Sequence, residues 1–510
     1  MESLKGFSVH TRKTLWIREV YAIRRNAASQ GLSESMMDEN AGHAVAAEVV
    51  REARGKRVLF LCGTGGKGSI GMAAARHAMA KVESEVTIIG RRERIVKEAA
   101  LVNYSLFGRE GKIREGKEGM EVVEKRLSDF DFIVDAIVGV GLRGALSQEY
   151  ANAVRAVNGS GKPVISIDVP SGMDADTGKA MPVCIKPKIL LELHKYKRGI
   201  ERKSFKESKL LDIGIPLSAE IMAGPGDIAL ATEPKAMASN KYSNGSVLVI
   251  GGSLGYTGAP ALAAAAAQSS LAALRTRAGY VTLMVPKKAY PIIAKVAGEV
   301  VVKSLAGETF CNEDFGEAGR IRHDALVIGP GLSDNEESYS AIAAFVRKER
   351  MAGKAVVADA SAVKALALHK KALEGIIVTP HDGEFECLSG TATAGLPLKE
   401  RAGICLRFAE RHRCIIVLKG NETIVSDGDL LKINRSESPA LATMGTGDVL
   451  AGIIASYATA HSGLFEDAVA GVYLHSRIGD MLGRSKGLHI TAGDVVGFIP
   501  DALRIFDRIS

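Results

Sequence analysis

The sequence has few residues of the kinds that mark disulfide-rich, zinc-binding or membrane-spanning proteins. Its six cysteines are scattered without a Cys-x-x-Cys pair, which supports neither a disulfide framework nor a zinc site. The alanine-rich stretch 259–273 is interrupted by Gln268, Ser269 and Ser270, and residues 1–12 lack the apolar core of a signal peptide. We therefore expect a soluble protein of the reducing cytoplasm, with no membrane partner.

The sequence is also poor in the features that accompany nucleic-acid binding. Its formal net charge is only +8, it has one tryptophan, and no dense basic run carries interleaved aromatic residues. The most basic stretch, residues 186–206, fits either a solvated loop or a surface for an anionic small ligand. We expect a small-molecule ligand, no nucleic acid, and a homo-oligomer as the assembly.

The length of 510 residues exceeds one typical core and predicts two domains. Gly224-Pro225-Gly226 breaks regular structure, so we place the join near Met222, with domains over residues 1–222 and 223–510. Short Val/Ile-rich runs alternate with helical spacing, as at 72–80 and 148–157, which predicts α/β domains with parallel sheets. Strands are predicted at 58–62, 86–90, 132–139 and 164–169, and then at 247–251, 280–285, 325–329, 355–359, 375–379 and 415–418.

Near the C-terminus, Gly445-Thr446-Gly447-Asp448 forms a glycine-rich turn before an apolar helix. Backbone N–H groups at a helix start attract phosphate, and glycine lets the backbone approach it closely. Asp448 is placed to take a proton from a hydroxyl that attacks the phosphate, as phosphoryl transfer requires. Taken alone, the motif fits an ordinary turn with Asp448 as a helix cap equally well.

Other loops of this half follow predicted strands, at the edge where open α/β sheets bind their ligands. They are Gly251 to Pro260, Gly329-Pro330-Gly331-Leu332, Thr379-Pro380-His381 and Lys419-Gly420-Asn421-Glu422-Thr423. Lys419 suits a phosphate partner, although lysines are common on surfaces. A lone His381 also fits a structural role.

Together these segments resemble the ADP- or ATP-dependent NAD(P)H-hydrate dehydratase family, whose fold resembles ribokinase, over residues 241–501. The resemblance implies phosphoryl transfer to the hydroxyl of the hydrated ring, assisted by Asp448, and then loss of phosphate, a better leaving group than water. Mg²⁺ is expected to neutralise the oxygens of the phosphoryl donor. The implied substrate-binding residues are Gly258, Ala259, Gly331 and His381, and the implied ADP- or ATP-binding residues are Lys419, Gly420, Asn421, Glu422, Thr423 and Gly447.

In the N-terminal half, Gly63-Thr64-Gly65-Gly66-Lys67-Gly68 follows a predicted strand and fits G-x-G-x-x-G, a weak indication of Rossmann-like dinucleotide binding. It is not a P-loop, because Leu61 and Gly68 stand where that motif needs glycine and Ser or Thr. The loops at 135–144 and 168–178 also follow predicted strands and favour a ligand cleft, although such residues make simple turns as well.

With Glu39-Asn40-Ala41-Gly42 and residues 191–199, these segments resemble the NAD(P)H-hydrate epimerase family over residues 10–215. The resemblance implies that Asp168 is the acid/base at the hydrated carbon and that Asp135 and Ser171 bind potassium. The implied substrate-binding residues are Gly66, Lys67, Gly68, Ser69, Ile70, Gly139, Val140, Gly141, Leu142, Arg143, Gly144 and Ala145.

The glycine loop departs from that family, since Lys67 replaces an ion-binding Asn and Ile70 replaces an Asp. We hypothesise that the Lys67 ammonium occupies the potassium site between Asp135 and Ser171, because a tethered positive charge satisfies the same oxygens. Epimerisation would then be insensitive to potassium. The alternative is that this half has lost activity and serves as a binding or packing domain.

The sequence thus predicts two three-layer α/β/α domains, the first Rossmann-like and the second ribokinase-like. It predicts nicotinamide nucleotide repair: epimerisation of hydrated NADH or NADPH, and dehydration of the S form with ADP or ATP. The alternatives are a dehydratase with a non-catalytic first half, a sugar- or vitamin-type kinase, and a nucleotide-sensing or scaffold protein with two degenerate clefts.

Overall fold

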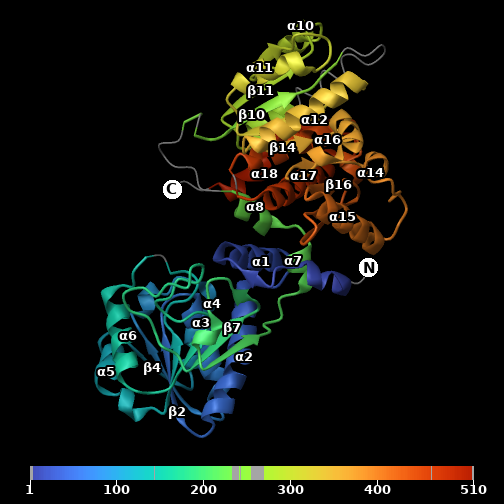
Figure 1. Cartoon of the computed structure of the whole chain (residues 1–510). Helices are drawn as coiled ribbons and strands as arrows, with labels where there is room; N and C mark the ends of the chain where they lie inside the picture. The colour runs from blue at the N-terminus through green and yellow to red at the C-terminus, as the bar shows by residue number, and fades with distance from the viewer. Residues whose placement is uncertain are drawn as a thin grey trace. The chain divides into compact units, whose positions relative to one another are not determined.

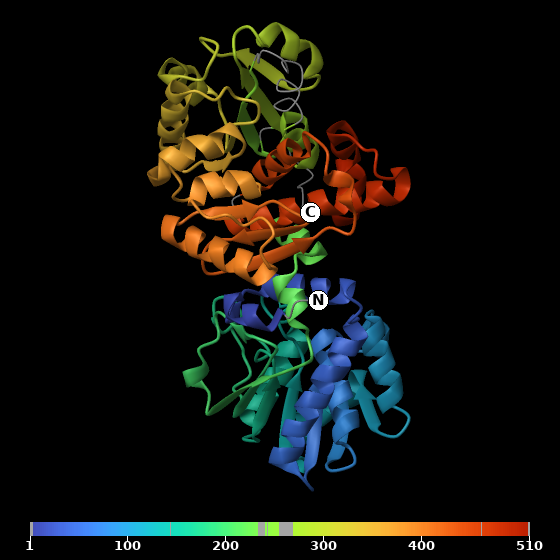
Figure 2. The same cartoon turned by 90° about the vertical axis from the view of Figure 1, so that its right-hand side faces the viewer.

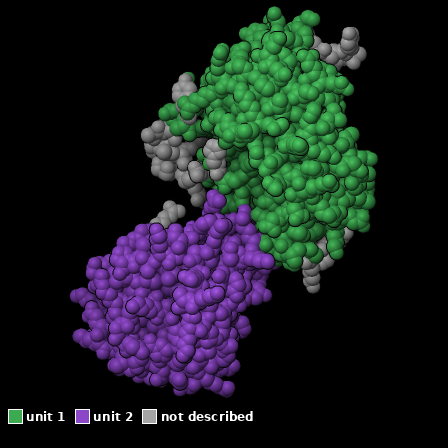
Figure 3. Space-filling view, viewed as in Figure 1, with its two compact units in different colours: residues 1–11, 217–510 green, residues 12–216 purple. Residues whose placement is uncertain are grey.

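The computed structural model describes residues 4–142, 144–232, 240–241, 243–253, 269–460 and 462–507. The chain divides into two compact units, one of residues 12–216 and one that joins residues 1–11 to 217–510 (Figures 1 and 3). The sequence places the join near Met222, a few residues later, and puts the first residues with the N-terminal domain.

The unit of residues 12–216 is built on a fully parallel seven-stranded sheet. Its strand order is β4-β3-β2-β5-β6-β7-β9, so the direction in which strands are added reverses between β2 and β5, as in doubly wound folds. A short parallel pair, β1 with β8, stands apart. The elements are β1 (Thr14–Leu15), α1 (Ile17–Ser29), α2 (Glu34–Ala53), β2 (Arg57–Cys62), α3 (Gly66–Ala78), β3 (Glu83–Ile88), α4 (Glu98–Phe107), β4 (Lys112–Glu115), α5 (Gly116–Lys125), β5 (Phe132–Ala136), α6 (Gln148–Gly159), β6 (Val164–Ile167), β7 (Ile189–Leu193), β8 (Tyr196–Lys197) and β9 (Glu207–Leu211).

Alternating side chains of β2 show that helices cover both faces of this sheet. Val58 and Phe60 share a buried core with residues of α2 and α3, whereas Leu59 and Leu61 share another with residues of α5 and α6. A strand buried on both faces is hydrophobic at every position, which is why its sequence reads as a continuous apolar run. The predicted three-layer, Rossmann-like architecture is confirmed.

The second unit contains a nine-stranded sheet of order β12-β11-β10-β13-β14-β15-β16-β17-β18. Strands from β12 to β16 are parallel, and the hairpin of β17 and β18 is antiparallel. The elements are α7 (Leu217–Ile221), α8 (Pro225–Ala231), β10 (Ser246–Ile250), β11 (Tyr280–Val285), α10 (Tyr290–Val296), β12 (Val301–Ser304), α11 (Phe315–Arg320), β13 (Ala325–Ile328), α12 (Glu336–Met351), β14 (Ala355–Ala358), α13 (Ser361–Leu368), β15 (Ile377–Val378), α14 (Asp382–Ser389), α15 (Leu398–His412), β16 (Ile415–Leu418), β17 (Glu422–Ser426), β18 (Leu431–Arg435), α16 (Thr446–Ala458), α17 (Leu464–Lys486) and α18 (Ala492–Leu503).

The nine-stranded sheet is also the middle of three layers (Figures 1 and 2). Leu248 and Ile250 of β10 belong to a core that includes residues of α12, α13 and α15, while Val247 and Val249 face a core that includes residues of α16 and α17. The predicted runs at 280–285 and 415–418 coincide with β11 and β16. The observed β13, β14 and β15 are shorter than their predicted runs, and β10 begins and ends one residue earlier than predicted. The second three-layer domain is confirmed. In the part of the chain that the structure describes, no helix is both long and apolar enough to cross a membrane.

The N-terminal segment packs into the core of the unit that carries the C-terminal half. Residues Leu4–His10 form a 3-10 helix whose Phe7 is only 4% exposed and belongs to the same core as Ile221 and Ile433. His10 Nδ1 lies 3.2 Å from the carbonyl oxygen of Asp429, on the turn between β17 and β18. The segment is therefore part of that unit's packing.

We expect Phe7→Ala to lower the free energy of unfolding of the C-terminal unit by about 3 kcal/mol, because it deletes a buried aromatic side chain and leaves a cavity. Denaturant unfolding, with hydrogen exchange of peptides from α7 and β18, measures the change. Val9→Ala is the matched control, since Val9 is 70% exposed. Equal effects of the two variants would contradict the packing described.

Candidate functional sites

The first candidate site lies at the carboxyl ends of β2, β5 and β6. Residues Gly66 to Ile70 open α3 directly after β2, the loop 139–145 follows β5, and Asp168 follows β6. Because β2 neighbours β5 and β5 neighbours β6, the sheet order brings these predicted substrate-binding and catalytic residues to one edge. Arg143, also predicted to contact the substrate, lies outside the described residues.

Two glycines of the G-x-G-x-x-G motif are required by close packing of the backbone. A Cβ atom on Gly68 would lie 1.9 Å from the carbonyl oxygen of Gly63, and one on Gly63 would lie 2.0 Å from that of Ile137. Any larger residue would push the start of α3 away from the loop that follows β5. The motif thus serves the tight junction that positions the site.

Asp168 is held in a strained conformation beside a buried lysine. Its φ is +63°, in the left-handed region that non-glycine residues rarely adopt. The Lys197 ammonium forms an ion pair with Asp168 Oδ1 and also donates to the carbonyl oxygens of Leu193 at 2.8 Å and Lys195 at 3.0 Å. The Leu193 N–H donates to the same Asp168 Oδ1 at 3.1 Å. One carboxylate oxygen is therefore fixed in place by two donors.

Lys67, Asp135 and Ser171 are in direct contact in the same unit. Lys67 Nζ lies 2.9 Å from Asp135 Oδ2 and 3.1 Å from Ser171 Oγ. Burial lowers the pKa of Lys67, and the adjacent Asp135 carboxylate opposes that shift. The ammonium therefore contacts the two residues that the resemblance to the epimerase family assigns to potassium.

The second candidate site lies at the carboxyl ends of β14, β15 and β16. Lys419, directly after β16, places its Nζ 2.8 Å from Asp359 Oδ1 and 3.9 Å from Glu384 Oε2. Thr379 Oγ1 donates to the same Asp359 oxygen at 2.8 Å. Although burial lowers the pKa of Lys419, the Asp359 and Glu384 carboxylates outweigh it and raise the pKa above the ordinary value. Lys419 is thus a buried, positively charged group.

Asp448 lies in the first turn of α16, whose N-cap Gly445 is left-handed with φ of +88°. Burial, followed by the negative charge of Asp359, raises the pKa of Asp448 to about 7, while Lys419 acts in the opposite direction. A Cβ atom on neighbouring Gly447 would lie 3.3 Å from Lys419 Nζ. The start of α16 therefore combines a carboxylate whose pKa is near neutrality with a nearby ammonium.

Other residues predicted for the second site lie in loops that follow its strands or outside the described residues. Gly331 follows Gly329, whose added Cβ would lie 1.9 Å from the carbonyl oxygen of Asp359, so this loop passes next to the end of β14. In the 419–423 loop, Thr423 Oγ1 donates to the carbonyl oxygen of Gly420 at 2.9 Å, which closes a tight turn. Gly258 and Ala259 lie outside the described residues.

His381 and Glu422 make local structural contacts. His381 Nδ1 accepts from the N–H groups of Gly383 at 3.1 Å and Glu384 at 3.2 Å, and so caps α14. The Glu422 carboxylate forms an ion pair with Arg435 across the hairpin of β17 and β18. These contacts give each residue a structural role.

Three polar residues near the two sites were not among the predicted site residues. Lys197 lies in the basic stretch 186–206 and in the segment 191–199 that carries the epimerase resemblance, and Asp359 is the last residue of a predicted strand, but neither was assigned a role. His475 of α17, a buried residue, gave no sequence signal; burial lowers its pKa to about 4, so it is neutral at physiological pH. Their partners are distant in sequence, which explains why local patterns did not single them out.

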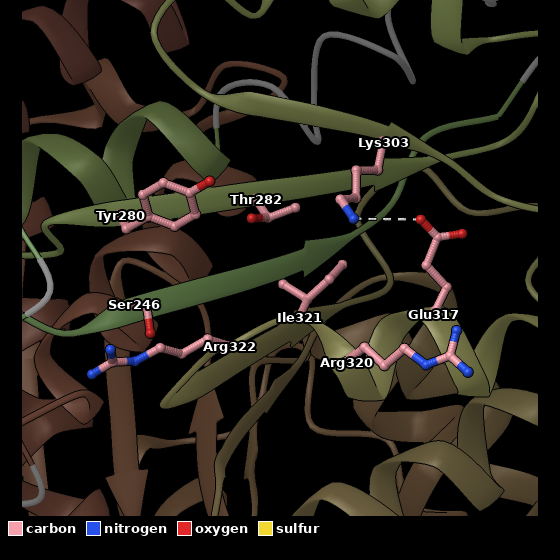
Figure 4. Close-up of a pocket in the computed structure, with 8 residues that line it drawn as sticks. All are labelled: Ser246, Tyr280, Thr282, Lys303, Glu317, Arg320, Ile321 and Arg322. Carbon is pink, nitrogen blue, oxygen red and sulfur yellow. Dashed lines mark hydrogen bonds and ion pairs between the residues drawn. The ribbon is translucent and has the colours of Figure 1, made fainter.

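A separate cavity of about 480 Å³ lies at the opposite edge of the nine-stranded sheet (Figure 4). Ser246 and Tyr280 are the first residues of β10 and β11, and Lys303 of β12 forms an ion pair with Glu317 at 3.5 Å. None of the predicted site residues lines it. Its lining residues are Ser246, Tyr280, Thr282, Lys303, Glu317, Arg320, Ile321 and Arg322.

Two family models match the chain, one in each half. The model described as YjeF-related protein N-terminus matches residues 33–199, and the model described as NAD(P)H-hydrate dehydratase matches residues 247–501. They define a two-domain α/β protein whose second part is of the dehydratase class.

Relatives match nearly the whole chain. The bifunctional NAD(P)H-hydrate repair enzyme Nnr of Pyrobaculum aerophilum is 34% identical over 504 residues, covering 95% of this chain and 97% of the relative. The enzyme of the same description from Methanopyrus kandleri is 32% identical, covering 96% of each. The chain belongs to the bifunctional NAD(P)H-hydrate repair enzyme family. Among solved structures, the ADP/ATP-dependent NAD(P)H-hydrate dehydratase of Bacillus subtilis, co-crystallised with ATP/Mg²⁺, is 26% identical, with 55% of this chain and 96% of that chain covered and a TM-score of 0.45.

Proposed function

We propose that this chain repairs hydrated NADH and NADPH in two reactions. The unit of residues 12–216 interconverts the R and S epimers, and the unit that carries the C-terminal half dehydrates the S epimer at the expense of ADP or ATP. The observation that carries the second activity is Asp448, a carboxylate with a pKa of about 7 at the start of a helix and near Lys419. The predicted cytoplasmic location and homo-oligomeric state stay predictions.

In the dehydration, Asp448 accepts the proton of the substrate hydroxyl as that oxygen attacks the terminal phosphorus of the nucleotide. The bond between that phosphorus and the bridging oxygen breaks, so the nucleotide leaves one phosphate shorter. The carbon–oxygen bond of the new ester then breaks with its electron pair on phosphate. A proton leaves the neighbouring ring carbon, and the ring double bond is restored.

Lys419 and the start of α16 supply the electrostatic part of this proposal. The ammonium near Gly447, together with helix N–H groups, suits the negative charge on the transferring phosphoryl group. Within the described ranges, no group of three or more His, Cys, Asp or Glu is arranged to hold a metal ion. Mg²⁺ typically binds through one or two carboxylates and substrate phosphates, so Glu384, and Asp359 through the oxygen that does not pair with Lys419, would hold it together with the nucleotide phosphates. When bound, it neutralises charge on the donor oxygens.

In the epimerisation, Asp168 takes the proton of the hydroxyl while the bond between the hydrated carbon and the ring nitrogen breaks, so that the carbon–oxygen bond becomes a double bond. The nitrogen then re-forms its bond on the opposite face of that carbon and Asp168 returns the proton to the oxygen, with no net proton gained or lost. The Lys197 ammonium and the Leu193 N–H both contact Oδ1 of Asp168 and fix that oxygen in place. Gly66 to Ile70 and the 139–145 loop are proposed to contact the substrate.

The purified protein with a mixture of hydrated NADH epimers and either ADP or ATP tests both activities through the return of nicotinamide absorbance. Complete recovery is expected. Recovery that halts once the S epimer is consumed would mean that the N-terminal unit is not catalytic. Accumulation of a stable phosphorylated compound without recovery would favour the small-molecule kinase.

We expect the rate of dehydration to depend on pH through Asp448. A general base works in its ionised form, and the raised pKa of about 7 means that this form is half populated near neutrality. The rate should therefore fall about tenfold for each unit of pH below about 6 and reach a plateau above about 8. Single-turnover rates with saturating nucleotide measure this, and a flat profile between these limits would contradict the role of Asp448.

A further inference from the structure

Lys67 places a positive charge at the centre of an oxygen cage inside the N-terminal unit. The residue is buried on α3, with a side chain that is 4% exposed. Its Nζ lies 2.7 Å from the carbonyl oxygen of Val169, 2.9 Å from Asp135 Oδ2, 3.1 Å from Ser171 Oγ and 3.4 Å from the carbonyl oxygen of Val138. One carboxylate, one hydroxyl and two carbonyls from separate parts of the chain thus surround one ammonium.

The residues present do not fit a potassium ion, although the resemblance to the epimerase family implies one. The cage has the all-oxygen donor set that suits a hard monovalent cation, but the covalently attached ammonium stands among those oxygens. A metal ion would have to displace Lys67 Nζ and would leave two positive charges against the single buried carboxylate of Asp135. Both sterics and charge therefore exclude it.

The carboxylate of Asp135 accepts several hydrogen bonds in addition to its ion pair with Lys67. It accepts from Ser166 Oγ at 2.8 Å, from the Ser171 N–H at 2.9 Å and from the Ile137 N–H at 3.2 Å. Lys67 Nζ is thus the positive partner of a buried carboxylate whose oxygens already accept several hydrogen bonds.

The ammonium also ties together the two loops of the first candidate site. Val169 follows Asp168 directly, and Val138 precedes the loop that begins at Gly139, so both carbonyls that Lys67 contacts adjoin predicted site residues. Asp168 has a φ of +63°, and a conformation of this kind persists only when its surroundings fix it. Lys67 is therefore placed as a positioning residue for Asp168.

We propose that Lys67 Nζ replaces a bound monovalent cation in the N-terminal unit, so that this unit is complete without potassium and loses its order when the ammonium is removed. The exclusion of the cation stands on geometry alone. The consequence for epimerisation rests on the proposed function.

The test compares the wild-type protein with Lys67→Asn in KCl and in choline chloride at equal ionic strength. Trp16, the single tryptophan, lies in the unit of residues 12–216 and reports its thermal unfolding by fluorescence. The wild-type midpoint and epimerisation rate should be the same in both salts. The variant should have a lower midpoint in choline chloride, and KCl should restore it with a saturating dependence because the emptied cage then binds the ion. The epimerisation rate of the variant should also rise, by about tenfold or more, as KCl replaces choline chloride.

Lys125→Asn is the matched control, because Lys125 is a lysine of the same unit with a 67% exposed side chain, and it should leave the response to salt unchanged. Potassium activation or stabilisation of the wild-type protein would overturn the proposal, as would a folded Lys67→Asn protein that ignores potassium. If the variant does not fold, thallium(I) NMR of the wild-type protein takes its place, with thallium(I) as a substitute for potassium. A signal from specifically bound thallium(I) would contradict the exclusion of a monovalent cation from this site, and the absence of such a signal would support it. If the wild-type protein unfolds at the same midpoint in both salts but shows no epimerisation in either, only the proposed function of this unit is contradicted.

Discussion

Replacing Asp448 with asparagine is expected to abolish dehydration driven by ADP or ATP. Asparagine keeps the size and one oxygen of the side chain but cannot accept the proton of the attacking hydroxyl. Loss of a general base typically lowers the rate by about 10²- to 10⁴-fold. Single-turnover recovery of NADH from the S epimer measures the loss, and nucleotide affinity should change much less.

Asp467→Asn is the matched control for that experiment. Asp467 lies on α17 of the same unit, and burial also raises its pKa to about 7, but its carboxylate accepts a hydrogen bond from Ser462, just before that helix. This variant should keep its dehydration activity. Equal losses in the two variants would show that removing any buried carboxylate of this unit is damaging, and the assignment of Asp448 would fail.

Stability should move in the opposite direction from activity in Asp448→Asn. The pKa of Asp448 is raised from 3.8 to about 7, so the folded state holds the proton more tightly than the unfolded state does. The wild-type protein therefore loses stability as pH rises from about 4 to 7, and the full penalty persists above 7. The variant escapes this penalty and should be more stable than wild type at pH 8, by about the amount that a buried charge costs.

Replacing Asp168 with asparagine is expected to stop epimerisation while dehydration of the S epimer continues. Recovery of NADH from an equal mixture of epimers should then end when the S form is consumed, with epimerisation slowed by about 10²- to 10⁴-fold. Chiral separation of the remaining hydrate measures this, and the residue should be the R form.

Asp174→Asn serves as the control for Asp168, because Asp174 lies in the loop that follows β6 and makes turn contacts with the N–H groups of Asp176 and Thr177. It should leave epimerisation intact. Since Asp168→Asn also leaves the buried Lys197 without its carboxylate, circular dichroism should show that the variant is folded. Consumption of the R form at the wild-type rate would disprove the acid/base role.

The architecture was predictable because strands buried on both faces are apolar at every position. Runs such as 280–285 and 415–418 mark β11 and β16 to the residue. The antiparallel pair of β17 and β18 was not predicted, although Asp427-Gly428, with φ of +102° at Gly428, carries a turn signal. The predicted 132–139 run ends as a strand at Ala136, because Gly139 already belongs to the loop at the site.

Pairings over long separations were the least predictable part. Lys197 and Asp168 are 29 residues apart, and Lys419 and Asp359 are 60 apart, so their contacts exist only once the sheets are assembled. The packing of Phe7 with Ile221 has the same cause. Lys67 differs, since its departure from a family motif drew attention to Asp135 and Ser171, and the structure has its Nζ within hydrogen-bonding distance of both.

The central claim is that the hydroxyl of the hydrated coenzyme attacks phosphorus and leaves as part of phosphate. Hydrated NADH carrying a heavy-oxygen label in that hydroxyl, incubated with the protein, Mg²⁺ and ADP or ATP, tests this directly through mass spectrometry of the released phosphate. The account predicts that each NADH formed is matched by one phosphate that carries the label. Label found in water, or NADH formed without consumption of the nucleotide, would contradict it.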